Sequence, residues 1–268
     1  VSERSEVCTD STYGSVTNFK STYTHPAFKF GSTELTGFWF GKFELSGSSS
    51  YVKMVPNASS YTGANMGTYF NAVKRVESTY GITNADSHVI KNMEWGAVAY
   101  LKQSKFGQGA TEVTINTKVY TGGGTGDAYK ANVSQSTTGN VYGVYDMNGG
   151  YWDNAMGIML NSGNAFYTGR TGLSSSIDPK YYDKYKYGGS TVQARGKLGD
   201  ATRETMKTYG TTKGGWYSNY ADFPFGSYNM ITRGGRYSHG ANAGEFALDY
   251  MTGAGGYNNT TRGSITAK

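Results

Sequence analysis

Apolar residues recur at helical spacing in two stretches of the first hundred residues. Between Met66 and Tyr80 they stand three and four positions apart, and Gly81 follows as a C-terminal cap. A second helix is predicted to begin at Asp86 or Ser87, either of which can cap its N-terminus. Its apolar face would hold Ile90, Met93, Ala97, Val98 and Leu101. The pattern therefore predicts two amphipathic helices.

Strand signals are short and sparse. Two apolar runs, at 27–30 and 38–43, flank a Gly-Ser-Thr turn and predict a hairpin. Residues 102–140 and 158–215 are rich in Gly, Ser, Thr, Lys and Tyr with little periodicity, so long loops are expected there. We interpret residues 1–22, which are polar and aperiodic, as an N-terminal arm or a frayed terminus. The remainder, residues 23–268, is expected to form one domain.

Composition narrows the possible classes of protein. Aromatic residues make up 15% of the chain and supply large buried areas, which argues against disorder in spite of 39 glycines. The net charge of +6 comes from dispersed lysines and arginines without a basic run, so no nucleic-acid partner is expected. No stretch approaches the roughly 20 apolar residues of a membrane-spanning helix. The single cysteine, Cys8, excludes an intrachain disulfide.

Four segments carry a resemblance to a known family. They are Phe40–Glu44 (aromatic, Lys, aromatic, Glu), Glu94-Trp95, the dense glycine and aromatic loop Tyr145–Asp153, and Arg233–Gly235, followed by Thr261-Arg262. In order and separation these segments resemble the formylglycine-generating-enzyme, or sulfatase-modifying-factor, family.

The resemblance, which covers about residues 37–262, implies a fold. It implies an α+β protein with a C-type lectin-like fold of the formylglycine-generating-enzyme type. In that fold, two helices pack on a twisted antiparallel sheet, secondary-structure content is low, and the loops are long.

The resemblance also implies that catalysis is absent. Enzymes of this family use two cysteines that bind copper, and the alignment places these at or near His239 and Gly244, neither of which is cysteine. Without thiolates a soft-metal site lacks its ligands. His25, His88 and His239 stand far apart, without the spacing of a zinc motif. We therefore expect no enzyme activity and no cofactor.

Three acidic residues in the resembling segments, Glu94, Asp146 and Asp153, suggest either acid-base chemistry or calcium binding. We favour a structural role, in which they accept backbone N–H groups or pair with an arginine such as Arg233. Some members of the family carry calcium, so one structural calcium ion near residues 146–154 remains an alternative. His239 as a metal ligand is a further alternative.

The stretch from Trp216 to Tyr250 has the composition of an adaptable binding surface, rich in Tyr, Ser, Gly and Asn. It resembles the last part of retroelement-diversified phage tropism determinants, where variable residues alternate with a fixed framework. That resemblance implies that Arg233, Gly234, Gly235, Gly244 and Phe246 hold the scaffold. The predicted ligand-binding residues are Trp216, Tyr217, Asn219, Asp222, Phe225, Tyr228, Asn229, Met230, Arg236, Tyr237, His239, Asn242, Glu245, Asp249 and Tyr250. The alternative is a tyrosine-rich cover without a dedicated partner.

These observations favour a non-enzymatic recognition domain of phage or bacterial-surface origin. It would act outside the cell or on a virion surface, such as a phage tail, and bind a host-surface protein or glycan. Trimeric display or attachment to a virion would offset weak single-site affinity. Two alternatives remain: a structural virion or filament subunit that uses the same loops for self-assembly, and a formylglycine-type oxidase or metal enzyme with a relocated site.

Overall fold

The chain combines helices with mainly antiparallel sheets, which confirms the α+β class. The computed structural model describes residues 24–163, 165–166, 169–188, 196–208 and 213–267. The predicted N-terminal arm and Cys8 lie outside these described residues.

The elements follow one another through a chain dominated by loops. The helices are α1 (Met66–Lys74), α2 (Val76–Thr79), α3 (Asn92–Gln103) and α4 (Ala128–Ala131). Short 3-10 helices are η1 (Pro26–Phe28), η2 (Thr121–Gly123), η3 (Val133–Gln135), η4 (Pro179–Tyr181), η6 (Trp216–Ser218) and η7 (Gly240–Asn242). The main sheet contains β7 (Trp152–Met159), β8 (Asp183–Tyr185), β9 (Met230–Gly234), β10 (Gly244–Met251) and β11 (Asn259–Thr260). A second sheet contains β3 (Trp39–Phe40), β6 (Ala85–Val89) and β12 (Gly263–Ala267). Two small hairpins are β1 (Lys29–Phe30) with β2 (Thr33–Glu34), and β4 (Ser46–Ser48) with β5 (Tyr51–Lys53).

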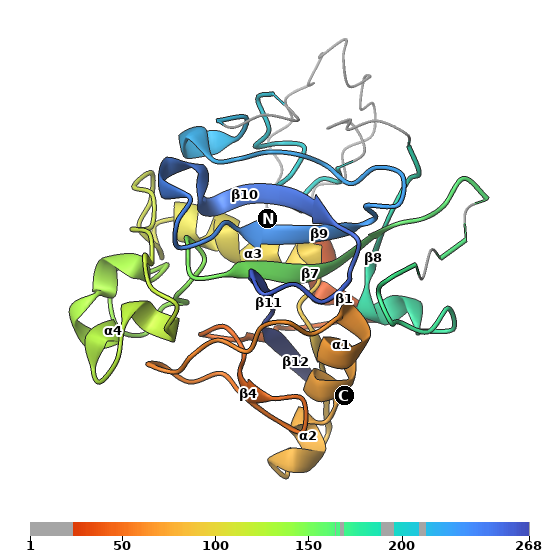
Figure 1. Cartoon of the computed structure of the whole chain (residues 1–268), viewed down its shortest axis with the longest axis horizontal. Coiled ribbons are helices and arrows are strands. Elements are labelled where there is room, and N and C mark those ends of the chain that lie inside the picture. Colours follow the sequence, from red (N-terminus) through yellow and green to blue (C-terminus); the bar gives the residue numbers. More distant parts are fainter. Residues whose placement is uncertain (1–23, 164, 167–168, 189–195, 209–212, 268) are drawn as a thin grey trace.

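Strand β7 is the centre of the main sheet and is buried along its whole length. One edge pairs with β9, which in turn pairs with β10, and both pairings are antiparallel. The other edge is shared by β11 at the start of β7 and β8 at its end, both parallel to it. Figure 1 shows β10, β9 and β7 side by side, with α1 and α2 on the far side of β7 from β10. The core draws residues from both sheets and from α1 and α3.

The first predicted helix is confirmed, although it is divided in two. Asn65 caps α1 because its side-chain oxygen accepts the N–H of Thr68 at 2.9 Å. Helix α1 ends at Lys74, and α2 continues from Val76 after a break at Arg75. Gly81 follows with a positive φ of 65°, as a helix terminus favours.

The second helix begins later than the pattern predicts. Neither Asp86 nor Ser87 caps it, because residues 85–89 form β6, which pairs with β12. Helix α3 starts at Asn92, where the Glu94 carboxylate accepts the N–H of Lys91 at 2.9 Å. The sequence of β6 resembles a helix cap because it contains polar residues, of which Asp86 and His88 are buried against charged partners.

The buried face of α3 also differs from the prediction. Trp95, Ala99 and Lys102 face the protein, whereas Leu101 is 56% exposed. The Trp95 indole N–H donates to the carbonyl of Glu245 at 2.8 Å and so fastens the helix to β10. Lys102 is charged but can face the interior because it has a buried partner. The spacing of apolar residues does not predict such a pair.

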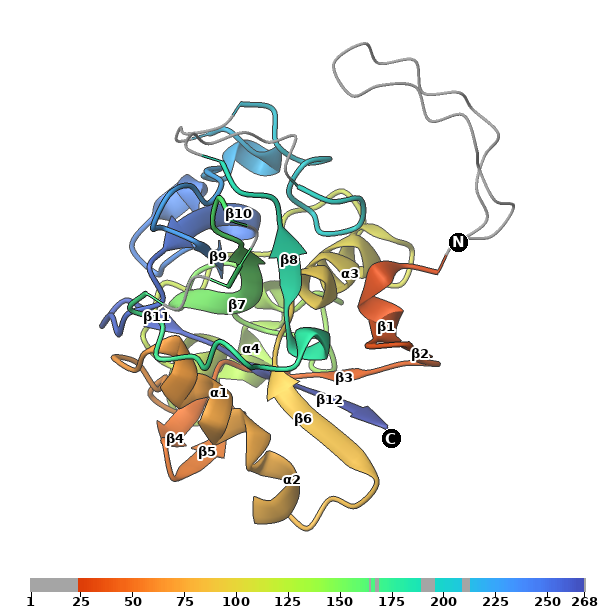
Figure 2. The same cartoon turned by 90° about the vertical axis from the view of Figure 1, so that its right-hand side faces the viewer.

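The predicted hairpin between residues 27–30 and 38–43 is wrong. Lys29 and Phe30 pair with the immediately following residues 33–34, through a turn in which Gly31 has φ 64°. Strand β3 pairs instead with β12, close to the other end of the chain, and β12 also pairs with β6 (Figure 2). Segments far apart in sequence thus close the second sheet.

Candidate functional site

The predicted ligand-binding residues lie on loops and strand ends around β9 and β10. Ten of the fifteen keep part of their surface exposed: Trp216, Tyr217, Phe225, Tyr228, Arg236, Tyr237, His239, Asn242, Asp249 and Tyr250. Tyr228 is the most exposed of them, with 43% of its surface exposed. The binding role of these ten remains a prediction.

The other five are buried and do not present their side chains at the surface, contrary to what a ligand-binding role predicts: Asn219, Asp222, Asn229, Met230 and Glu245. Asn219 instead joins neighbouring loops. Its amide group donates to Glu112 and to the carbonyl of Ala243, both at 2.8 Å, and its oxygen accepts the N–H of Phe246 at 3.2 Å. Met230 begins β9 and packs in the core. Polar side chains in irregular loops are often buried because they form hydrogen bonds with backbone groups. A composition typical of binding surfaces therefore predicts more exposed residues than the structure contains.

One end of β10 carries three aromatic rings and two carboxylates, which we name the acidic aromatic patch: Asp222, Phe225, Tyr228, Asp249 and Tyr250. The ring centroids lie 4.8 Å apart for Phe225 and Tyr250, 5.2 Å for Tyr228 and Tyr250, and 5.7 Å for Phe225 and Tyr228. Phe225 and Tyr228 exchange backbone hydrogen bonds of 3.0 and 2.9 Å across a tight turn. This turn holds both rings against the strand.

The two carboxylates of the patch lie beside each other. The N–H of Asp222 donates to the carbonyl of Leu248 at 2.9 Å, which places it next to Asp249. Burial, together with the charge of Asp222, raises the pKa of Asp249 to about 7, although the N–H of Tyr250 donates to it at 2.8 Å. Burial, followed by the charges of Asp249 and Asp222, raises the pKa of Tyr220 as well. The acidic groups therefore converge.

The loop before β10 and the start of β7 form a second cluster, the basic aromatic patch: Tyr151, Trp152, Arg236, Tyr237 and His239. The rings of Tyr151 and Tyr237 lie 5.7 Å apart, and those of Trp152 and His239 lie 5.6 Å apart. The Arg236 guanidinium lies 5.7 Å from the centre of the Tyr237 ring. Burial, with the charge of Arg236, lowers the pKa of His239. Acidic side chains thus lie near one end of β10 and Arg236 lies near the other.

One predicted site residue, Glu245, belongs to a buried ion pair with Lys102. Lys102 Nζ lies 2.5 Å from Glu245 Oε1, and both side chains are fully buried. The ring of Tyr217 covers the ammonium group at 5.0 Å, and its hydroxyl donates to the carbonyl of Ala110 at 2.9 Å. Nearby Glu112 has a pKa raised to about 7 by burial and by Glu245. This pair supports the face from below.

A second buried network joins the segments that carry the family resemblance. Arg262 donates to one oxygen of Asp153 at 2.6 and 3.0 Å. It also donates to the carbonyls of Tyr145, Asp146 and Gly41 at 2.9, 3.0 and 3.2 Å. Asp153 thus pairs with an arginine, as expected, but this arginine is Arg262 and not Arg233, because β11 and β12 bring Arg262 to the carboxylate.

The other acids of these segments are also engaged. Asp146 accepts the N–H of Gly122 and the amide of Asn116 at 2.8 Å, and Glu44 accepts the N–H of Tyr151 at 2.7 Å. Burial raises the pKa of Asp146 and Glu44, with Arg262 opposing the shift. These contacts fit the structural role expected of Asp146, since the carboxylate oxygens of Asp146 and Glu44 already have partners.

Arg233 occupies a separate buried position. Its guanidinium donates to the carbonyl of Ala201 at 2.9 Å and lies 5.8 Å from the centre of the Trp95 ring. The Arg262 guanidinium lies 5.6 Å from the same ring. Burial lowers the pKa of Arg233 to about 10, with the charge of Asp200 opposing the shift. Trp95 and the two arginines thus bind α3 to the sheet.

The histidines occupy separate sites. His88 lies 2.8 Å from the Glu94 carboxylate in the core, and His25 lies 2.9 Å from the carbonyl of Gly199. His239 packs on Trp152. Within the described part of the chain, no group of three or more His, Cys, Asp or Glu residues is placed to hold a metal ion.

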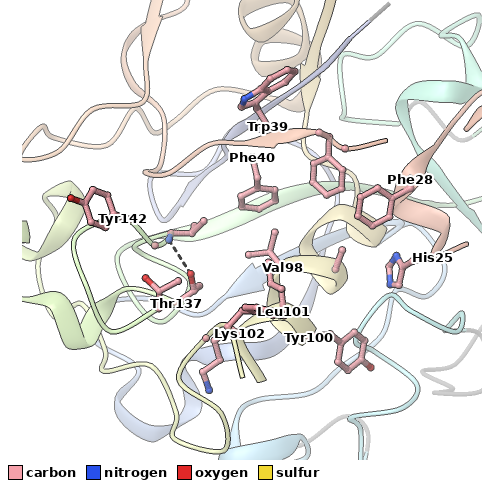
Figure 3. Close-up of a pocket in the computed structure, with 18 residues that line it drawn as sticks. His25, Phe28, Trp39, Phe40, Val98, Tyr100, Leu101, Lys102, Thr137 and Tyr142 are labelled. Atoms are coloured by element: carbon pink, nitrogen blue, oxygen red, sulfur yellow. Dashed lines mark hydrogen bonds between the residues drawn. The ribbon is translucent and has the colours of Figure 1, made fainter. Parts of the chain in front are cut away.

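A cavity beside α3 is lined by none of the predicted ligand-binding residues. It has a volume of about 630 Å³ and is lined mainly by apolar side chains from η1, β3, α3 and the loop around residue 142. Figure 3 shows Phe28, Phe40 and Val98 directed toward one another across this groove. At its margin Trp39 is 66% exposed, Leu101 56%, Phe106 69% and Tyr142 86%. An exposed apolar surface of this kind is more often an interaction site than a surface without a partner.

Sequence analysis missed this groove because its residues were interpreted as core. The apolar run at 38–43 and Leu101 carry the same pattern as buried positions. Their exposure depends on how η1 and the loop around Tyr142 approach α3, which involves contacts across the whole chain. No local sequence signal distinguishes an exposed apolar residue of this kind from a buried one.

Compared with known proteins, the chain matches no family model and no curated sequence. Within the residues that the structure describes, no helix is both long and apolar enough to cross a membrane.

Proposed function

We propose that this chain is a non-enzymatic recognition domain of phage or bacterial-surface origin, with a C-type lectin-like fold of the formylglycine-generating-enzyme type. It binds a host-surface protein or glycan through the loops around β9 and β10. The observation that carries this proposal is the pair of partly exposed aromatic patches at the two ends of β10, together with the buried Lys102–Glu245 ion pair that holds β10 to α3.

The fold assignment is supported by contacts among the resembling segments. Arg262 donates to Asp153 and to the carbonyl of Tyr145, and its guanidinium lies 5.6 Å from the rings of both Phe40 and Trp95. Four segments separated widely in sequence therefore meet at one side chain. If the chain shares the framework of the family that it resembles, these segments must meet in this way.

The non-enzymatic assignment is supported by the position where the resemblance places the second family cysteine. A Cβ atom added to Gly244 would lie 2.1 Å from the Asn219 side-chain oxygen. Such a contact excludes any side chain unless the amide moves. This position therefore serves packing between loops.

Binding of the full chain to intact bacterial cells and to an array of glycans tests the proposal. Tyr228→Ala and Arg236→Ala, one in each patch, are expected to weaken binding, because aromatic and arginine side chains dominate recognition surfaces. Tyr142→Ala is the matched control, since Tyr142 is 86% exposed outside both patches. Binding that survives both patch variants but is lost in the control would contradict the proposal.

The groove favours a second candidate function, that of a structural subunit in a virion or filament. Its exposed apolar margin, including Trp39 and Leu101, suits contacts between copies. Native mass measurements across a range of concentrations test this alternative. It predicts oligomers that Leu101→Ser dissociates, whereas a monomer at all concentrations would reject it.

A further inference from the structure

We propose that the basic aromatic patch binds an acidic sugar, a uronic or sialic acid, with Arg236 holding the carboxylate and Tyr237 stacking on the sugar ring. The inference rests on the proposed recognition function and narrows it to one class of ligand at one end of β10.

The loop between β9 and β10 is fixed by contacts within itself. The N–H of His239 donates to the carbonyl of Arg236 at 2.8 Å, which closes a tight turn. At the base of the loop, a Cβ atom added to Gly235 would lie 2.4 Å from the Cα atom of Ala243, so the two ends of the loop are in contact. A binding group on such a loop loses little conformational freedom when a ligand arrives.

Arg236 is a partly exposed cation whose orientation is restrained by two neighbours. Its Nε–H group donates to the hydroxyl of Ser238 at 3.0 Å, and its guanidinium lies 5.7 Å from the centre of the Tyr237 ring. The bond to this neutral hydroxyl uses one of the five N–H donors of a guanidinium. A carboxylate can accept two of the other donors side by side, which is the arrangement in which arginine binds carboxylates most strongly.

The charge of Arg236 acts on the side chains around it. Burial lowers the pKa of His239, and the charge of Arg236 lowers it further. Burial raises the pKa of Tyr151, and Arg236 opposes that shift. The carboxyl group of Glu44 accepts the N–H of Tyr151 at 2.7 Å, but burial and neighbouring carboxylates raise its pKa, so it opposes Arg236 less than an exposed carboxylate would. The patch therefore favours an anion.

The tyrosine rings of the patch provide a surface for stacking. Tyr151 and Tyr237 are both partly exposed, and their rings lie 5.7 Å apart at an angle of 78°. The N–H of Tyr237 donates to the carbonyl of Gly150 at 2.8 Å, which holds the two residues beside each other. In an edge-to-face pair, the ring that presents its edge keeps both of its faces clear of the other ring. The C–H groups of a sugar ring stack on such a face because this removes apolar surface from water.

The cation and the rings together favour an acidic sugar. A neutral sugar would stack on the rings without using the charge of Arg236. A carboxylate side chain of a peptide would pair with Arg236 but has no ring to cover the tyrosines. In a uronic or sialic acid, the carboxylate is attached directly to the sugar ring, so one sugar unit meets both groups.

The main probe is tetragalacturonate, compared with its methyl ester and with tetraglutamate. The ester keeps the sugar rings without the charges, whereas tetraglutamate keeps the charges without the rings. Sialyllactose serves as a second acidic sugar. Each compound is titrated into the full chain at pH 7 and about 0.15 M salt, and NMR chemical shifts identify the bound positions. The acidic sugars are expected to shift the resonances of Tyr151, Arg236 and Tyr237, and tetragalacturonate should bind more tightly than the ester or tetraglutamate.

Two variants separate the contribution of charge from that of stacking. Arg236→Gln should weaken the binding of tetragalacturonate about three- to tenfold and leave that of the ester unchanged, because it removes a charge-assisted contact at a partly exposed site. Tyr237→Leu should weaken both sugars by a similar factor, since stacking does not depend on the carboxylate. Arg75→Gln is the matched control, because it removes the same charge from an exposed arginine outside the patch. Thermal unfolding confirms that each variant is folded before its affinity is compared.

Shifts centred on the patch, with an affinity for tetragalacturonate that falls in Arg236→Gln but not in Arg75→Gln, support the proposal. Equal affinities for the acid and its ester overturn it, and so does an absence of binding by both acidic sugars at millimolar concentration. Tetraglutamate that binds at least as tightly as tetragalacturonate also overturns it, because the patch would then recognise acidic peptides.

The same measurements separate this inference from the proposed function. If Tyr228→Ala and Arg236→Ala weaken binding to cells while the acidic sugars bind no better than the ester, the proposed function survives and the acidic-sugar site is rejected. If the acidic sugars bind through Arg236 but the chain does not bind cells, the site stands and the proposed recognition of a host surface fails.

Discussion

Replacement of Arg262 by methionine should destabilise the fold more than any change at an exposed ion pair. Arg262 is fully buried and donates to Asp153 and to three backbone carbonyls. Methionine fills a similar length without charge. The variant therefore removes the cation and leaves the Asp153 carboxylate buried without its partner.

The magnitude follows from that uncompensated charge. Removing one member of a buried ion pair costs about 3 to 5 kcal/mol, whereas an exposed pair contributes about 0 to 1 kcal/mol. Asp146 and Glu44 share the field of Arg262, so their pKa values should rise further in the variant. We therefore expect the free energy of unfolding of Arg262→Met to fall by about 3 to 5 kcal/mol at pH 7.

Urea unfolding, followed by tryptophan fluorescence, measures this difference because Trp95 lies 5.6 Å from the Arg262 guanidinium. The control is Lys130→Met, which removes an ion pair whose side chains are 55% and 73% exposed. The penalty of Arg262→Met should shrink between pH 7 and pH 5. In the folded variant the buried carboxylates bind protons at higher pH than in the unfolded chain, so acidification stabilises the folded state. A loss below about 1 kcal/mol, equal to that of Lys130→Met, would refute the network.

Three further predictions concern the Lys102–Glu245 ion pair, the acidic aromatic patch and the packing of α1. Lys102→Met should lower the free energy of unfolding by about 3 kcal/mol because it leaves Glu245 buried without a cation, and adding Glu245→Gln should recover part of that loss in a double-variant comparison by urea unfolding. The free energy of unfolding of the wild type should fall relative to that of Asp249→Asn as the pH rises from about 4 to about 7, because the folded protein then holds a proton that the unfolded chain has released. Thermal unfolding at several pH values measures this relative stability. A gain in the relative stability of the wild type over this range would contradict the prediction. Gly67→Ala should destabilise α1, since the added Cβ would lie 2.1 Å from the carbonyl oxygen of Gly172, and an unchanged melting temperature would show that the two segments do not approach so closely.

Helix α1 could be predicted from the sequence because its apolar positions, such as Tyr69 and Val73, face the core at regular spacing. Strand β6 could not, because Asp86 and His88 are polar although they are buried. Asp86 is held by Lys180 at 2.9 Å and His88 by Glu94 at 2.8 Å. The local sequence pattern does not show which side chains from other elements will pair with these residues.

The candidate site shows the same limit. The composition of residues 216–250 correctly indicated a partly exposed aromatic surface, including Tyr228 and Tyr250. It could not separate exposed residues from internal supports such as Asn219 and Glu245, because both kinds are polar and stand in the same irregular loops. Recognition of the motif around Asp153 likewise did not identify Arg262 as its partner, since the two residues are 109 positions apart.

Hydroxyl-radical footprinting of the full chain bound to intact bacterial cells tests the recognition face most directly. Each aromatic side chain reports its own contact with solvent, so free and bound protein can be compared residue by residue. The account predicts protection of Tyr228, Tyr237 and Tyr250, with unchanged reactivity at Tyr142 and Phe106 in the groove. Protection of Tyr142 and Phe106, with the β10 patches as reactive as in the free protein, would contradict it.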